Sequence, residues 1–137
     1  MIEFFLPMQK LPTATHQQKQ VTVRNGKPHF YEPPQVAQAR AKLSAHLDAH
    51  KPHKPMDGPL QAVVKWCYPN HGSKPNGAYK ATRGDLDNMA KLMLDVMTRL
   101  GYWHDDSQVA SLVLEKFWAN PPGIYVRINQ LEVQHDC

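Results

Sequence analysis

The chain has 137 residues, of which 42% are apolar and 20% charged, as expected for one small folded domain with its own core. It has no apolar run long enough to cross a membrane, and its two cysteines are too few for a disulfide scaffold or a zinc site. The net charge is +4. Glu3 and Pro7, close behind Met1, predict that a secretory signal is absent, and the low cysteine content predicts a reducing, cytoplasmic location.

The first third of the chain predicts a strand and a hairpin. Apolar residues alternate with others over residues 2–6, which is typical of a short strand. Residues 21–24 and 27–31 flank Asn25-Gly26, a pair that suits the positive φ angles of a tight hairpin turn. Pro28 lies in the second arm, and proline favours the edge of a sheet.

A helix, a strand and a long loop follow the hairpin. Pro33-Pro34 opens a stretch with apolar residues at helical spacing, and Pro52 ends it. Residues 60–68 alternate as in a strand with one buried face. The segment 69–84 contains three glycines and two prolines, and a loop of this length between regular elements is often functional.

The last third predicts a second helix and two more strands. Apolar residues keep helical spacing from Leu86 to Leu100, with Asp85 suited to the N-cap and Gly101 to the C-terminal stop. Strand patterns follow over residues 109–118 and 124–129. The element order predicts one α+β domain over residues 1–137, with a mixed sheet and two main helices.

Basic residues are concentrated in two parts of this chain. Residues 1–54 hold eight Lys/Arg and three Asp/Glu, whereas residues 55–137 hold eight and nine, so the halves carry +5 and −1. Segments 4–31 and 58–84 have no acidic residue, which favours a polyanion such as nucleic acid, although a solubilising surface has the same composition. The side chains expected to contact phosphate are Lys10, Lys19, Arg24, Lys27, Lys80 and Arg83.

Acidic residues gather around the second helix. Asp85 and Asp87 lie at its start, and Asp105 and Asp106 follow its end. Carboxylates brought within a few ångströms stay ionised together only around a cation, and oxygen ligands without histidine or cysteine favour Mg²⁺ or Mn²⁺. However, a helix of 15 residues is roughly 22 Å long, so Asp106 reaches Asp85 only through a shorter helix, a crossing geometry or a dimer partner.

Structural interpretations of the same acids stay open at this point. Asp85 can act as a plain N-cap, and Asp87 can pair with Lys91 one turn later on the helix surface. Asp105 and Asp106 can form a solvated turn.

The sequence from Arg83 to Asn88, with Lys91, Asp95 and residues 100–109, closely resembles the RusA family of Holliday junction resolvases, which occur in bacteria and their phages. The shared pattern is D-x-D-N-x3-K-x3-D followed by G-x-W-x-D-D-x-Q-V, over about 25 residues. Family members tend to carry basic residues just before the first aspartate, whereas this chain has Gly84 there.

The resemblance implies a Mg²⁺-dependent endonuclease that resolves four-way DNA junctions. It implies that Asp85, Asp87 and Asp106 bind Mg²⁺, for which Mn²⁺ substitutes, and that Lys91 is needed for cleavage. An ammonium beside the scissile phosphate would offset developing charge. The resemblance also implies a homodimer, in which symmetry gives two equivalent cuts. The alternatives are a branched-DNA binding module without catalysis and a nuclease for forks or flaps.

Four other features carry weaker expectations. His46, His50 and His53 have metal-like spacing but no evident fourth ligand, so zinc is disfavoured. Trp103 is expected to anchor the core, and His104 to sit in a turn. Tyr79, in the basic loop, is a candidate for stacking on a base.

Overall fold

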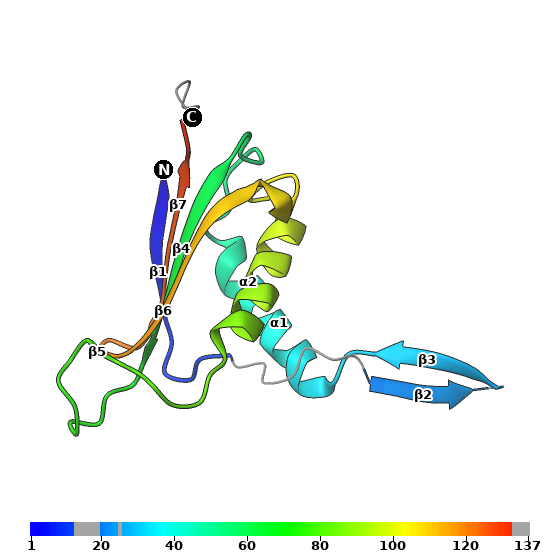
Figure 1. Ribbon diagram of the computed structural model, residues 1–137, viewed down its shortest axis with the longest axis horizontal. Coiled ribbons are helices and arrows are strands. Elements are labelled where there is room, and N and C mark those ends of the chain that lie inside the picture. The colour runs from blue at the N-terminus through cyan, green and yellow to red at the C-terminus, as the bar shows by residue number, and fades with distance from the viewer. Residues whose placement is uncertain (13–19, 25, 133–137) are drawn as a thin grey trace.

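A five-stranded mixed sheet forms the body of the protein, in the order β1-β7-β4-β6-β5 (Figure 1). The computed structural model describes residues 1–12, 20–24 and 26–132. All pairs in this sheet are antiparallel except β4 and β6, which run parallel. The strands are β1 Ile2–Pro7, β4 Leu60–Tyr68, β5 Ala78–Tyr79, β6 Val109–Trp118 and β7 Gly123–Gln130. The expected α+β fold with a mixed sheet is confirmed.

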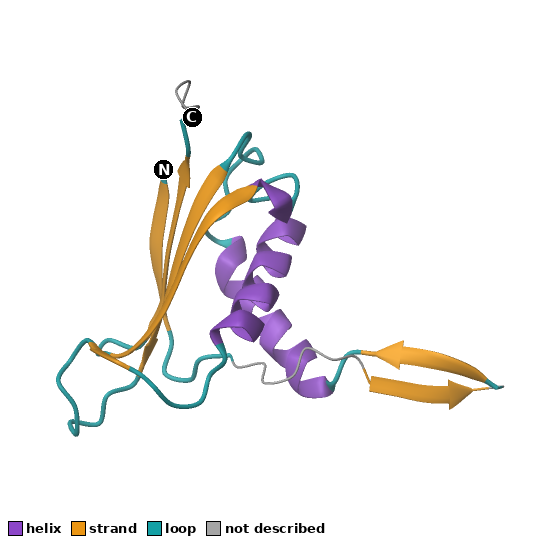
Figure 2. Cartoon of the chain, viewed as in Figure 1, coloured by secondary structure: helices purple, strands orange, loops and turns teal. Residues whose placement is uncertain are grey.

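Two helices, α1 (Pro34–Asp48) and α2 (Leu86–Leu100), pack against one face of the sheet (Figure 2). Alternate residues of each central strand point toward them, which is the reason for the period of two in the sequence. Trp66 from β4, Met93 from α2 and Ile128 from β7 are all at most 2% exposed in this core. No helix of the described residues covers the other face of the sheet.

The connection β4–α2–β6 fixes where the two ends of α2 lie. Because β4 and β6 are parallel, α2 must run in the opposite direction to both strands. The start of α2 therefore lies beside the carboxyl ends of β4 and β6, and its end lies beside the start of β6 (Figure 1). Gly101 ends the helix with φ +87°, a left-handed conformation that glycine adopts without strain.

The expected hairpin is present and stands apart from the main sheet. Strands β2 (Gln20–Arg24) and β3 (Lys27–Tyr31) pair only with each other, and the ribbon extends away from the body (Figure 1). Gly26 has φ +75°, as the turn requires, while Asn25 lies outside the described residues. No helix within the described ranges is long and apolar enough to span a membrane.

Two short elements were not predicted. Strand β5 lies inside the long loop after β4, and a 3-10 turn, η1 (Asp106–Gln108), lies between α2 and β6. A strand of two residues has no periodicity to detect, because its existence depends only on pairing with the end of β6.

Candidate functional site

Asp85 occupies the N-cap position of α2 without using its side chain as a cap. The helix begins through the backbone, where Met89 N–H donates to Asp85 O at 3.0 Å, and no capping hydrogen bond reaches the Asp85 carboxylate. Asn88 Nδ2 donates to its Oδ2 at 3.5 Å. The carboxylate is exposed, so plain N-capping does not account for an aspartate here.

Asp87 and Lys91 lie one helical turn apart on the exposed side of α2. Neither side chain takes part in an ion pair within the part of the chain that the structure describes, so the alternative of a surface pair between them is not formed. An uncompensated carboxylate at a helix N-terminus is favoured by the helix dipole. Asp87 and Lys91 are thus both available to a ligand.

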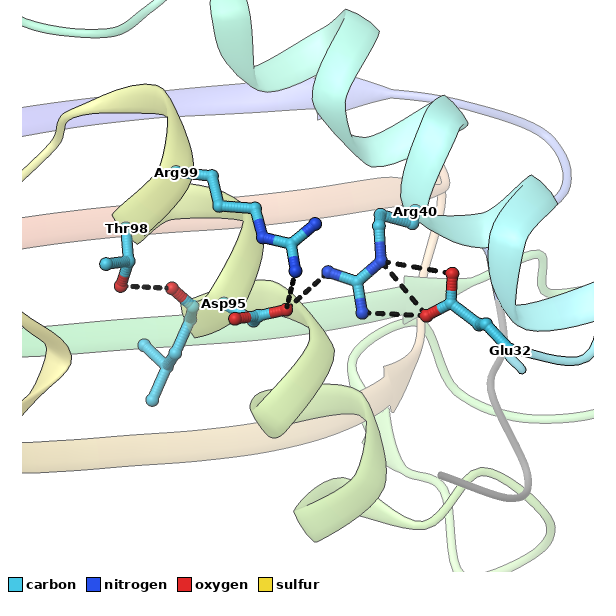
Figure 3. Close-up of polar contacts among 6 residues, drawn as sticks. Glu32, Arg40, Asp95, Thr98 and Arg99 are labelled. Carbon is cyan, nitrogen blue, oxygen red and sulfur yellow. Dashed lines mark hydrogen bonds and ion pairs between the residues drawn. The ribbon is translucent and has the colours of Figure 1, made fainter. Parts of the chain in front are cut away.

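Asp95, one turn further, has a structural partner instead (Figure 3). Arg40 from α1 bridges its carboxylate and that of Glu32, donating to Glu32 Oε1 at 2.8 Å. Arg99 lies 3.8 Å from the same Asp95 oxygen. These contacts tie α1 to α2, and hydrogen bonding to Glu32 raises the pKa of Arg40 further above its ordinary value.

The two aspartates after α2 differ in role. Asp105 Oδ1 accepts from Ser107 N–H at 3.1 Å, and Gln108 Oε1 accepts from Asp105 N–H at 3.0 Å, which forms a capping box around η1. Gln108 also donates to the carbonyl of Met56 at 2.9 Å, which fastens the segment to the chain before β4. Asp106 is exposed and is not part of this capping box.

The charges of this acid pair are unequal. The hydrogen bond from Ser107 N–H lowers the pKa of Asp105, so this carboxylate stays ionised. Sharing a hydrogen bond with Asp105 raises the pKa of Asp106, and the negative charges of Asp105 and Asp95 raise it further. Asp106 is therefore the acid of this pair that gains most from a nearby cation.

The structure does not bring the three site aspartates together within one chain. Asp85 and Asp87 lie at the start of α2 and Asp106 beyond its end, and a 15-residue helix separates them by roughly 22 Å. Among the described residues, no group of three His, Cys, Asp or Glu side chains could hold a metal ion. In a single chain, Asp85 and Asp87 thus lie together at the start of α2, while Asp106, the third expected ligand, lies near the other end of the helix.

Two lysines hold the loop that leads into Asp85, a feature that the sequence reasoning missed. Lys80 Nζ donates to Thr82 Oγ1 at 2.9 Å and to the carbonyl of Arg83, and it lies 4.6 Å from the ring centre of Tyr68. Lys116 Nζ donates to the carbonyl of Gly84 at 2.8 Å. These bonds fix the backbone immediately before the first aspartate.

This arrangement departs from the expectation that Lys80 contacts phosphate. The residue is only 8% exposed, and its ammonium points into the loop, between the rings of Tyr68 and Trp118. Burial, followed by the charge of Lys116, lowers its pKa. No signal in the sequence distinguishes this inward lysine from its exposed neighbour Arg83.

Gly84 is required by its surroundings. Its φ is +118°, and a Cβ there would lie 2.7 Å from Tyr68 Oη. The Tyr68 hydroxyl in turn lies 3.3 Å from Met89 Sδ on α2. The missing basic residue before Asp85 therefore has a physical cause, because a side chain at this position would strain the backbone and displace Tyr68.

Three of the other residues expected to contact phosphate are exposed. Lys10, Lys27 and Arg83 are exposed, so their charges are available to DNA. Lys19 lies outside the described residues, and Arg24 lies in β2 on the projecting hairpin.

The remaining expectations have clear outcomes. Trp103 is 1% exposed and donates to Thr98 Oγ1 at 2.7 Å, which confirms it as a core anchor. His104 Nε2 lies 2.9 Å from Asp57 Oδ1 rather than against Asp105 or Asp106. The ring of His50 stacks on Phe4 at 4.4 Å. Tyr79 is 69% exposed and packs 4.7 Å from the Phe117 ring, and its use for base stacking stays a prediction.

Comparison with known proteins agrees with the sequence pattern. A family model described as "Endodeoxyribonuclease RusA" matches residues 10–129. The chain is 35% identical to the "Crossover junction endodeoxyribonuclease rusA" of Lactococcus phage r1t, over 94% of this chain and 98% of that one. It is 29% identical to the "Uncharacterized protein YqaN" of Bacillus subtilis (strain 168), over 80% and 84% of the two chains.

Proposed function

The chain belongs to the RusA family, and we propose that it is a Mg²⁺-dependent endonuclease that resolves four-way DNA junctions as a homodimer in the cytoplasm of a bacterial cell. One observation carries the choice of site. Of the acids around α2, Asp95 is held by Arg40 and Asp105 caps η1, whereas Asp85, Asp87 and Asp106 are exposed and take part in no ion pair among the described residues. Exposed carboxylates that no cation of the fold neutralises fit a metal ligand set.

Asp85, Asp87 and Asp106 would hold Mg²⁺, and their oxygens match the ligands that this ion prefers. When bound, the ion supplies Lewis acidity at the phosphate and favours deprotonation of water. Lys91 is exposed one turn after Asp87, where its ammonium can offset charge that develops on the phosphate. Lys80 and Lys116 would orient Asp85 by fixing the preceding backbone.

We further propose that each site takes its third aspartate from the second copy. The separation along α2 prevents Asp106 from reaching Asp85 of its own chain. If two copies meet about a two-fold axis with their α2 helices antiparallel, Asp106 of each approaches Asp85 and Asp87 of the other. Two equivalent sites result, which matches the two cuts that resolution of a four-way junction needs.

A mixing experiment tests the shared site. Asp85→Asn and Asp106→Asn proteins are each expected to bind junctions without cutting them. When the two are mixed and allowed to exchange subunits, half of the sites in each mixed dimer hold only native aspartates, so nicking of a single strand returns. If every site lay within one chain, each chain would carry one lesion and mixing would restore nothing.

Substrate comparison tests the activity itself. Labelled four-way junctions, forks, flaps and linear duplex are incubated with and without Mg²⁺, and the cuts are mapped on every strand. We expect symmetric cuts in the junction that disappear in EDTA, with binding retained. Equal cutting of all substrates would contradict junction selectivity. Binding without cuts under any divalent metal would favour the binding-module alternative.

Exposed cations are the proposed DNA contacts. Arg83 lies in the loop two residues before Asp85, Lys10 follows β1, and Lys27 lies at the turn of the projecting hairpin. Replacing a residue of this kind with glutamine is expected to weaken binding to all DNA forms alike and to reduce its salt dependence.

A further inference from the structure

The loop after β4 is held in one shape by three asparagines. Asn120, in the turn between β6 and β7, donates from Nδ2 to the carbonyl of Asn70 at 2.8 Å and accepts from Asn70 N–H at 3.2 Å. The backbone N–H of Asn120 donates to Asn76 Oδ1 at 2.6 Å. Asn70 Nδ2 also donates to the carbonyl of Lys74 at 2.8 Å, which closes the loop on itself. Together, Asn70, Asn76 and Asn120 form an asparagine clasp.

The clasped loop has no core of its own. Every residue from 71 to 77 is exposed. Exposed loops without apolar contacts are normally the mobile parts of a protein, and ordering them costs conformational entropy. The clasp keeps this loop ordered before any ligand binds, and such preorganisation lowers the entropy that binding must remove. A fixed, exposed loop of this kind is suited to contacting a partner.

The loop is also fixed relative to the proposed metal ligands. Residues 116–120, at the end of β6 and just after it, hold both segments. The ammonium of Lys116 donates at 2.8 Å to the carbonyl of the residue before Asp85. Gly77 N–H donates at 2.8 Å to the carbonyl of Trp118, and the clasp is anchored two residues later. The loop and Asp85 therefore share one support, which sets the position of each relative to the other.

The charge of the loop matches a DNA backbone. No acidic residue occurs from 58 to 84. Lys74 is exposed and takes part in no ion pair among the described residues. Figure 1 shows the loop, beside β5, and the hairpin of β2 and β3 on opposite sides of the start of α2. A DNA arm with its phosphate at Asp85 and Asp87 would thus have a basic projection on each side.

We propose that the loop over residues 69–77 is a preorganised DNA-contact element, in which Lys74 contacts the phosphate backbone of the arm being cut and the asparagine clasp positions Lys74. The proposal rests on the proposed function for the identity of the ligand, and it adds a contact outside the metal site. A contact to phosphate does not depend on the base sequence, so the loop would hold the arm in place without choosing the bases at the cut.

Salt-dependent binding tests the phosphate contact. The affinity of Lys74→Gln for a labelled four-way junction is measured in EDTA, over a range of salt concentrations. Loss of one phosphate contact should lower the slope of log affinity against log salt by about 1, and the affinity itself about eightfold in about 0.1 M salt. Lys65→Gln is the matched control. It removes the same charge on β4, where Glu115 Oε1 lies 3.6 Å from Lys65 Nζ, and should leave slope and affinity nearly unchanged.

A double-variant cycle tests the clasp. Asn120→Ala should speed hydrogen exchange in residues 70–77 and weaken junction binding as Lys74→Gln does. If the clasp acts by placing Lys74, adding Lys74→Gln to Asn120→Ala should weaken binding by less than about twofold more. Asn76→Ala, which leaves the bonds between Asn70 and Asn120 in place, takes the role of Asn120→Ala if that protein does not fold. Faster exchange with unchanged binding, or losses that simply add, would overturn the positioning role.

The outcomes separate this contact from the proposed function. Lys74→Gln with the native affinity and salt slope would overturn the contact, and junction cutting by the same protein would leave the proposed function intact. A native chain that binds junctions but never cuts them under any divalent metal would refute the proposed function. In that case the comparison of Lys74→Gln with Lys65→Gln would still decide whether the loop contacts DNA.

Discussion

Replacing Gly84 with alanine tests whether the close contact before Asp85 controls both stability and cutting. The new Cβ would lie 2.7 Å from Tyr68 Oη, which is closer than real Cβ contacts allow. The φ of +118° adds backbone strain of about 1–3 kcal/mol, and forcing a methyl group into a filled site adds about 1–3 kcal/mol. We therefore expect Gly84→Ala to lose about 2–6 kcal/mol of unfolding free energy.

Two companion variants separate these causes. Gly72 has φ +90° with no atom within 4 Å of a built Cβ, so Gly72→Ala should show the backbone strain alone. In Tyr68→Phe/Gly84→Ala the clashing hydroxyl is absent and the next atom, the ring Cζ, lies at an ordinary 3.5 Å. This double variant should recover the steric part, about 1–3 kcal/mol, relative to Gly84→Ala.

Urea denaturation gives the free energies, and junction cleavage at saturating protein gives the activity. Because Gly84 directly precedes Asp85, we expect Gly84→Ala to lower the cutting rate more than it lowers junction affinity. A Gly84→Ala protein as stable as the native chain, to within about 0.5 kcal/mol, would refute the argument from Tyr68. So would a double variant no more stable than Gly84→Ala.

Three further predictions concern the site, the helix contact and the pH range. Asp87→Asn should abolish cutting while leaving junction binding and thermal stability nearly unchanged, as gel shift and calorimetry would show, because Asp87 is exposed and forms no ion pair among the described residues. Arg40→Ala should lower stability by about 1–2 kcal/mol, measured by urea denaturation, since it unlinks Glu32 and Asp95, whereas Arg99→Ala should cost less than about 0.5 kcal/mol at 3.8 Å. Burial raises the pKa of Tyr102, whose hydroxyl donates to Leu47 O, so the folded state keeps a proton that the unfolded state loses above pH 10.0. Stability should therefore fall as the pH rises past about 10, and Tyr102→Phe should flatten this fall in thermal melts at pH 9 and pH 11.

Elements with local signals were predicted well from the sequence. The bounds of α2 follow from apolar spacing between a capping aspartate and Gly101, and the structure places the helix over Leu86–Leu100 as expected. The length of that helix, calculated from its rise per residue, also predicted that Asp85 and Asp106 lie far apart. Both results depend on geometry that a single segment determines.

The features that were missed depend on contacts between distant segments. Lys80 and Arg83 are both cations in one acid-free loop, yet one is buried and the other exposed. What separates them is the position of Trp118 and Tyr68 beside Lys80, which arises when β5 pairs with the end of β6. Composition and spacing along the chain hold no information about that pairing.

Because the acids differ in role, the specific cleavage activity is expected to depend on protein concentration. Asp95 and Asp105 serve the fold of one chain, whereas the proposed ligands Asp85, Asp87 and Asp106 form a complete set only across two chains. A lone chain would then carry two incomplete sites and should not cut DNA. Specific activity should consequently fall on dilution below the dimer dissociation constant. Activity measured over a dilution series checks this, and a specific activity that stays constant down to the lowest concentrations would contradict the shared site.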